Sequence, residues 1–114
     1  MSEHLILMYR LRPGVTPEAY EAWVRDHDAP YVRSRPTVIG FEIYRLGEAI
    51  GGAADHLPAY VEMVEVTSIR ADQAALAEPR GRGLTAAWQE LADGAVIVNA
   101  VQVMAYRRVE GERT

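Results

Sequence analysis

The side chains best suited to proton chemistry lie in one short stretch, at His27 and Asp28, shortly after two aromatic residues, Tyr20 and Trp23. Residues 23 and 27 follow residue 20 by three and seven positions, so on an α-helix the three side chains share one face. An imidazole titrates near neutral pH, and an adjacent carboxylate can orient it or accept its proton. His27 and Asp28 are therefore candidate catalytic residues, and Tyr20 and Trp23 are candidate substrate contacts.

Each of these residues also has a purely structural interpretation. A histidine near a helix C-terminus is favoured because its cation complements the helix dipole. An aspartate shortly before Pro30 is typical of a turn. Large aromatic residues on an amphipathic helix commonly anchor that helix to a core. The sequence leaves both interpretations of this segment open.

Three further polar residues, Glu42, Tyr44 and Glu62, lie in segments that alternate apolar and polar side chains. Successive side chains of a β-strand point to opposite faces, and these three are out of phase with Phe41 and Val61. We therefore predict that they point away from the helices, into a cavity, as substrate-binding residues. An acid inside an apolar cavity has a raised pKa and can act as a general acid, whereas an acid at the rim is solvated.

The composition is that of one small soluble domain spanning residues 1–114, and it narrows the class of protein. The net charge is −4, with no basic stripe, which argues against nucleic-acid binding. The chain has no cysteine, and its three histidines lack the spacing of a metal site. No apolar run is long enough to cross a membrane, and we find no secretion signal. We expect no metal, no cofactor, no membrane partner and a cytoplasmic location.

The pattern of apolar residues predicts the order βαββαβ. Strands are expected at residues 4–11, 38–46, 59–66 and 95–106. The first helix is expected at residues 17–27, with a further helical turn after Pro30, and the second is expected in two pieces, at residues 68–76 and 85–92. The glycine-rich residues 47–58 would form a long hairpin loop between the second and third strands.

This order is typical of an α+β, ferredoxin-like fold, in which a four-stranded antiparallel sheet carries both helices on one face. The other face keeps apolar side chains, notably from the last strand, and an exposed patch of this kind usually marks an interface. We therefore predict a homodimer in which two sheets pack face to face as a dimeric α/β barrel. Its interior would hold a pocket.

Three segments in the first half of the chain carry a family resemblance: residues 11–23 (LRPGVTPEAYEAW), 28–30 (DAP) and 38–45 (VIGFEIYR). They resemble the RedY-like proteins of the dimeric α/β-barrel superfamily, which are associated with prodigiosin and bisindole pigment biosynthesis. The related EthD-like branch has a Tyr-x-x-Trp-x-x-x-His-x-Pro pattern, which Tyr20, Trp23 and His27 satisfy. Pro30 comes one residue later than in that pattern, so either His27 or Asp28 could take the place of its histidine.

The resemblance implies a small aromatic or polycyclic ligand that is bound inside each half-barrel and shielded from water. Our hypothesis is a cofactor-independent enzyme of aromatic secondary or degradative metabolism. It would cyclise, isomerise or dehydrate a small hydrophobic substrate by acid–base chemistry. Two alternatives stay open: a non-catalytic small-molecule-binding or assembly module, and a cofactor-free monooxygenase.

Overall fold

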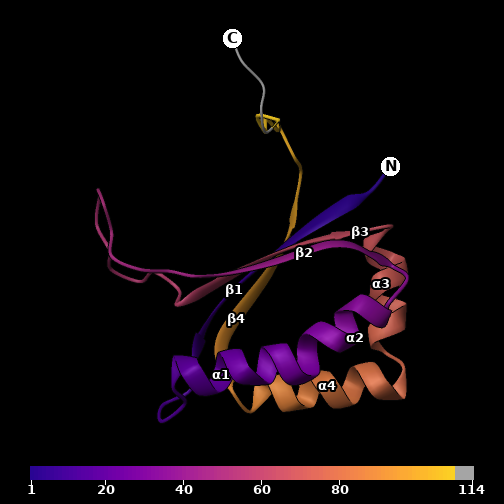
Figure 1. Ribbon diagram of the computed structural model, residues 1–114, viewed down its shortest axis with the longest axis horizontal. Helices are drawn as coiled ribbons and strands as arrows, with labels where there is room; N and C mark the ends of the chain where they lie inside the picture. Colours follow the sequence, from indigo (N-terminus) through magenta and orange to yellow (C-terminus); the bar gives the residue numbers. More distant parts are fainter. Residues whose placement is uncertain (110–114) are drawn as a thin grey trace.

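The computed structural model describes residues 1–109, which form a β-sheet and a layer of helices on one of its faces (Figure 1). The strands pair antiparallel in the order β2-β3-β1-β4 and are β1 (Glu3–Leu11), β2 (Val38–Arg45), β3 (Tyr60–Val66) and β4 (Ala92–Ala100). The helices are α1 (Pro17–Trp23), the π-helical η1 (Val24–Asp28), α2 (Ala29–Ser34), α3 (Ile69–Leu76) and α4 (Pro79–Gln89). The predicted ferredoxin-like α+β fold is confirmed.

The first helical segment is longer than predicted, because it contains a π-helical turn. The side chain of Thr16 caps α1 by accepting a hydrogen bond from the backbone N–H of Ala19 at 3.1 Å. The helix then continues without a break through η1 into α2, and Pro30 lies in the first turn of α2. The predicted helix end near His27 is therefore wrong. The wide π-helical turn admits a proline, which has no N–H to donate, without ending the helix.

The second helical segment is broken in two, as predicted, but α4 begins at Pro79 and not at Thr85. Proline suits the first position of a helix, where its missing N–H needs no partner. Gly81 is buried inside α4, and a Cβ atom there would lie 2.5 Å from the carbonyl oxygen of Leu76 and 2.6 Å from the hydroxyl oxygen of Tyr31. The glycine thus permits the close approach of α4 to α2 and to the end of α3, and does not break the helix.

The last strand is shorter than predicted, and residues 101–109 extend beyond the sheet (Figure 1). The final pair of β4 joins Ala100 to His4, and β1 itself begins at Glu3, so β1 offers almost no partner for the residues that follow. This segment is exposed and partly apolar, with Val101, Val103, Met104 and Tyr106 in contact with solvent. We refer to residues 101–109 as the C-terminal arm.

The two faces of the sheet differ in what covers them. The face toward the helices carries the buried core, which includes Leu5, Tyr9, Tyr60, Val64 and Val66. None of the helices in the described part of the chain covers the opposite face (Figure 1). That open face carries partly exposed apolar side chains, among them Tyr44, Met63, Val96 and Val98. It is the uncovered apolar face that the strand pattern predicts.

Candidate functional site

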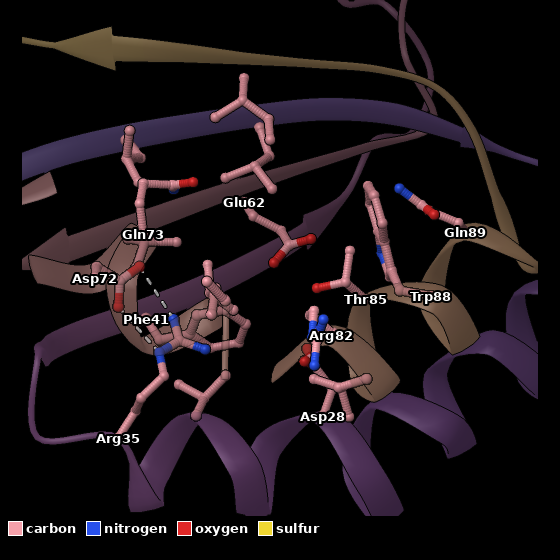
Figure 2. Close-up of a pocket in the computed structure, with 18 of the residues that line it drawn as sticks. Asp28, Arg35, Phe41, Glu62, Asp72, Gln73, Arg82, Thr85, Trp88 and Gln89 are labelled. Carbon is pink, nitrogen blue, oxygen red and sulfur yellow. Dashed lines mark hydrogen bonds and ion pairs between the residues drawn. The ribbon is translucent and has the colours of Figure 1, made fainter. Parts of the chain in front are cut away.

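A pocket of about 460 Å³ lies between the helices and the sheet, and not on the open face (Figure 2). Its walls are mostly apolar and include Leu5, Leu7, Phe41, Val64, Leu84 and Ile97. Two carboxyl groups, those of Asp28 and Glu62, also line it. A pocket of this size with apolar walls and a few polar groups is typical of a small-molecule site.

The π-helical turn brings Asp28 into the pocket and leaves His27 outside. Asp28 is 8% exposed and lines the pocket, whereas His27 is solvent-exposed and does not. An α-helix would place residue 27 below the buried Tyr20, but the π-helical turn takes up one extra residue, so residue 28 arrives there instead. The same extra residue accounts for the late position of Pro30. The structure thus favours Asp28 of the two alternatives, while the catalytic role of either residue stays a prediction.

Glu62 faces the helices, and the predicted direction of its side chain is wrong. In the register of the sheet, Glu62 lies opposite Ile43, while Phe41 lies opposite Val64, so all four share the helix-covered face. The alternating pattern correctly puts Glu62 and Val61 on opposite faces of the sheet. The face that packs against the helices, however, is that of Glu62 and not that of Val61. Glu62 is 5% exposed. Figure 2 shows its side chain reaching from the sheet toward the hollow that Asp28 enters from the helix below.

Glu42 and Tyr44 point away from the helices, as predicted, but they lie outside this pocket. Both are exposed, and the Tyr44 hydroxyl donates a hydrogen bond to Glu42 at 2.9 Å. Glu42 borders a second hollow of about 570 Å³ between the open face and the beginning of the C-terminal arm. The structure therefore separates these two residues from the carboxyl pair.

Tyr20 and Trp23 do not line the pocket either. Tyr20 is fully buried in the core beneath α1, and Trp23 packs partly against that core. Trp23 also lies near His27, with 6.4 Å between the ring centroids, so this row of aromatic side chains leads from the core to solvent. The structure favours the core interpretation of both aromatic residues.

Burial changes the proton affinity of both pocket carboxyl groups. Loss of solvation raises the pKa of Asp28 to about 6, although the positive charge of Arg35 acts in the opposite direction. Loss of solvation raises the pKa of Glu62 to about 7; a hydrogen bond from Tyr9 lowers this pKa, and the negative charge of Asp28 raises it further. Near neutral pH, one carboxyl group can therefore be ionised while the other holds a proton. That is the arrangement required of a paired general base and general acid.

Hydrogen bonds join Trp88, Tyr20 and Tyr9 in the core next to Glu62. Trp88 Nε1 donates to the Tyr20 hydroxyl at 3.0 Å, and the hydroxyl oxygens of Tyr20 and Tyr9 are 2.6 Å apart. Because an indole N–H can only donate, Tyr20 accepts from Trp88, and either hydroxyl can donate in the bond between Tyr20 and Tyr9. The Tyr9 hydroxyl in turn lowers the pKa of Glu62. Burial raises the pKa of Tyr9 and of Tyr20 well above the ordinary value, so both hydroxyls keep their hydrogens.

An ion pair lies at one side of the pocket (Figure 2). Arg35 Nε and Nη2 donate to the two carboxylate oxygens of Asp72 at 2.9 and 3.3 Å, and the Thr37 hydroxyl donates to the same carboxylate at 2.6 Å. Asp72 is 1% exposed. The charge of Arg35 is therefore already balanced within the protein.

Sequence reasoning missed Tyr9, Trp88 and the Arg35–Asp72 pair. Tyr9 has the same strand phase as Leu5, which could have indicated that its ring is buried. Nothing in the sequence indicates that Arg35 and Asp72 meet, because their elements are distant along the chain. Within residues 1–109, no group of three or more His, Cys, Asp or Glu side chains could hold a metal ion. Over the same range, no helix has the length and apolar character needed to cross a membrane.

Comparisons with known proteins relate the chain to a family. The family model described as REDY-like protein HapK matches residues 3–104. No curated protein matches the chain significantly in sequence. Among solved structures, HapK from Hahella chejuensis is 23% identical, with a TM-score of 0.71 over 94% of this chain and 99% of that chain.

Two further structures have the same fold. The hydroxynitrile lyase from Passiflora edulis is 12% identical, with a TM-score of 0.72 over 93% of this chain and 97% of that chain. A protein from Thermobifida fusca, described as a dimeric ferredoxin-like protein of unknown function, is 18% identical, with a TM-score of 0.63 over 90% of this chain and 92% of that chain. At these identities the similarities show the fold alone.

Proposed function

The chain belongs to the family of REDY-like HapK proteins, and on that premise we propose that it is a cofactor-independent enzyme of aromatic secondary or degradative metabolism. It would cyclise, isomerise or dehydrate a small hydrophobic substrate by acid–base chemistry. The observation that carries this proposal is the pair of buried carboxyl groups, Asp28 and Glu62, in one apolar pocket.

The two pKa values suggest a division of roles. At pH 7 Asp28, with a pKa of about 6, is mostly ionised and would accept a proton from the substrate. Glu62, with a pKa of about 7, is about half protonated and would deliver a proton to a substrate oxygen or carbon. In an isomerisation or cyclisation the proton taken up is matched by the proton delivered. In a dehydration the delivered proton leaves with the hydroxyl group as water.

The apolar walls define the kind of substrate. Phe41, Val64 and Ile97 offer hydrocarbon contacts to a flat or polycyclic body, and burial of that body would displace water from the carboxyl groups. A drier pocket would raise both pKa values further, which would keep Glu62 protonated and make an ionised Asp28 a stronger base. A strongly hydrated substrate would gain nothing from these walls.

We also propose that two copies associate through their open sheet faces. The apolar side chains of Tyr44, Met63, Val96 and Val98 are partly exposed on this face, and the apolar C-terminal arm extends from its edge. The structure from Thermobifida fusca is described as dimeric, which supports a homodimer. Because the pocket lies on the helix side of each sheet, each protomer would keep its own site. We place the protein in the cytoplasm, which its cysteine-free composition suits.

The test begins with mass spectrometry of the purified protein for bound aromatic compounds, followed by turnover assays with those compounds. Asp28→Asn and Glu62→Gln should each bind the compound and lose most turnover, by about 10²–10⁴-fold. Asp26→Asn is the matched control, because Asp26 lies in the same π-helical turn but is exposed and outside the pocket. His27→Gln should also keep full turnover.

The outcomes separate the rival functions. Full turnover in both carboxyl variants would refute acid–base catalysis by this pair. A compound that binds the wild-type protein and leaves unchanged would indicate a binding module. Oxygen consumption in step with turnover would indicate a cofactor-free monooxygenase.

A further inference from the structure

The pocket is lined by two arginines that differ in how their charge is balanced. Arg35 forms two hydrogen bonds with Asp72, at 2.9 and 3.3 Å, and its side chain is 10% exposed. Arg82, on α4, is exposed, and in the described part of the chain its side chain forms no hydrogen bond or ion pair. In Figure 2 the Arg35–Asp72 pair lies at one side of the pocket, and Arg82 lies away from that pair. Of the two arginines, Arg82 is therefore the one whose guanidinium group is free to bond to a ligand.

The charged groups around the pocket come from every element that packs there. Asp28 enters from η1, Arg35 follows α2, Glu62 comes from β3, Asp72 from α3 and Arg82 from α4. Arg35 and Asp72 cancel each other. Asp28 and Glu62 are buried acids, which take the protonated form more readily than exposed acids do. Neither acid forms an ion pair with Arg82, so in the described part of the chain Arg82 is available to pair with a negatively charged group from solution.

We propose that Arg82 is an anion anchor and that the ligand of this pocket is an apolar aromatic monocarboxylate. Its carboxylate lies at Arg82, in contact with solvent, and its aromatic body lies against the apolar walls near Asp28 and Glu62. This inference rests on the proposed function only in that it concerns the same pocket.

The chemistry of the guanidinium group favours a carboxylate. Its planar array of N–H donors matches the two oxygens of a carboxylate, and charge-assisted hydrogen bonds of this kind are about twice as strong as neutral ones. A phosphate needs more cationic partners than one exposed arginine supplies, and the chain as a whole carries a net charge of −4. An anchored carboxylate would also fix which atoms of the aromatic body meet the two acids, which gives the site its orientation.

The experiment compares two probes of the same shape, the anion naphthalene-2-carboxylate and the neutral naphthalene-2-carboxamide. Isothermal titration calorimetry gives the affinities, and NMR shifts of pocket amides show where each probe binds. The wild-type protein should bind the acid at least about tenfold more tightly than the amide, and this preference should fall as salt is added.

Variants assign that preference to one side chain. Arg82→Gln should abolish the preference for the acid and leave the affinity for the amide unchanged, and Arg82→Lys should restore part of it. Arg80→Gln is the matched control, since Arg80 lies on the same helix but contacts Ser34 and the ring of Tyr31 and does not line the pocket. It should change neither affinity.

The results distinguish this inference from the proposed function. Equal binding of the two probes to the wild-type protein would show that Arg82 is an ordinary solvated side chain. An equal loss of both in Arg82→Gln would show that Arg82 contributes packing and not pairing with a carboxylate. Either result would overturn the anchor while the pocket stands. Absence of binding and of pocket shifts with both probes would overturn the anchor and the assignment of the pocket as a ligand site together.

Discussion

Replacing Glu62 by glutamine should remove a large pH-dependent loss of stability. In the folded protein the pKa of this carboxyl group is raised from 4.5 to about 7, mainly by loss of solvation. Between these values the folded protein holds a proton that the unfolded chain has released, so the free energy of unfolding falls as pH rises. The difference between the two pKa values corresponds to about 3 kcal/mol, lost progressively from about pH 4.5 to about pH 7.

Glutamine has a similar shape and no proton to lose in this range. The free energy of unfolding of Glu62→Gln, relative to the wild-type protein, should therefore increase by about 3 kcal/mol between about pH 4 and about pH 8. Urea unfolding followed by circular dichroism at a series of pH values measures this difference. Glu42→Gln removes the same charge from an exposed position on the neighbouring strand and should give a curve parallel to that of the wild-type protein.

The result that would refute the reasoning is a Glu62→Gln curve that also stays parallel to the wild-type curve. It would mean that water reaches Glu62 as freely as it reaches an exposed carboxylate. The case for a dry carboxyl pair would then fail.

Three further substitutions test other contacts. Tyr9→Phe removes the hydroxyl that lowers the pKa of Glu62, so the carboxyl carbon should titrate at higher pH by NMR; an unchanged value would show that the Tyr9 hydroxyl does not act on Glu62. Gly81→Ala places a Cβ 2.5 Å from a backbone oxygen and should cost about 1–3 kcal/mol in thermal unfolding, against a gain in helix propensity of up to about 1 kcal/mol. Equal stability would show that α4 can shift. Asp72→Asn leaves Arg35 buried beside a neutral partner and should cost about 3–5 kcal/mol in urea unfolding; a loss below about 1 kcal/mol would show that water solvates Arg35.

Much of the fold follows from local pattern. Alternating side chains in β2 and β3, the Thr16 cap and the proline that follows it each depend on neighbours within a few residues, which can be seen in the sequence. The helix order and the open apolar face then follow from the βαββαβ arrangement. The helical periodicity of the sequence could not reveal the π-helical turn, because helical spacing is counted with 3.6 residues per turn. That count put His27 on the face of the helix that Asp28 occupies in the structure.

The amino-acid pattern was thus sufficient for the order of the elements, for the single-sided sheet and for the family, since each depends on short-range spacing. The pairing of the two site residues could not be predicted from short-range spacing. Asp28 and Glu62 come from a helix and a strand that are far apart in the chain, and their side chains share a pocket because the helices cover one particular face of β3. Their raised pKa values follow from exclusion of water, and every element packed around a carboxyl group contributes to that exclusion.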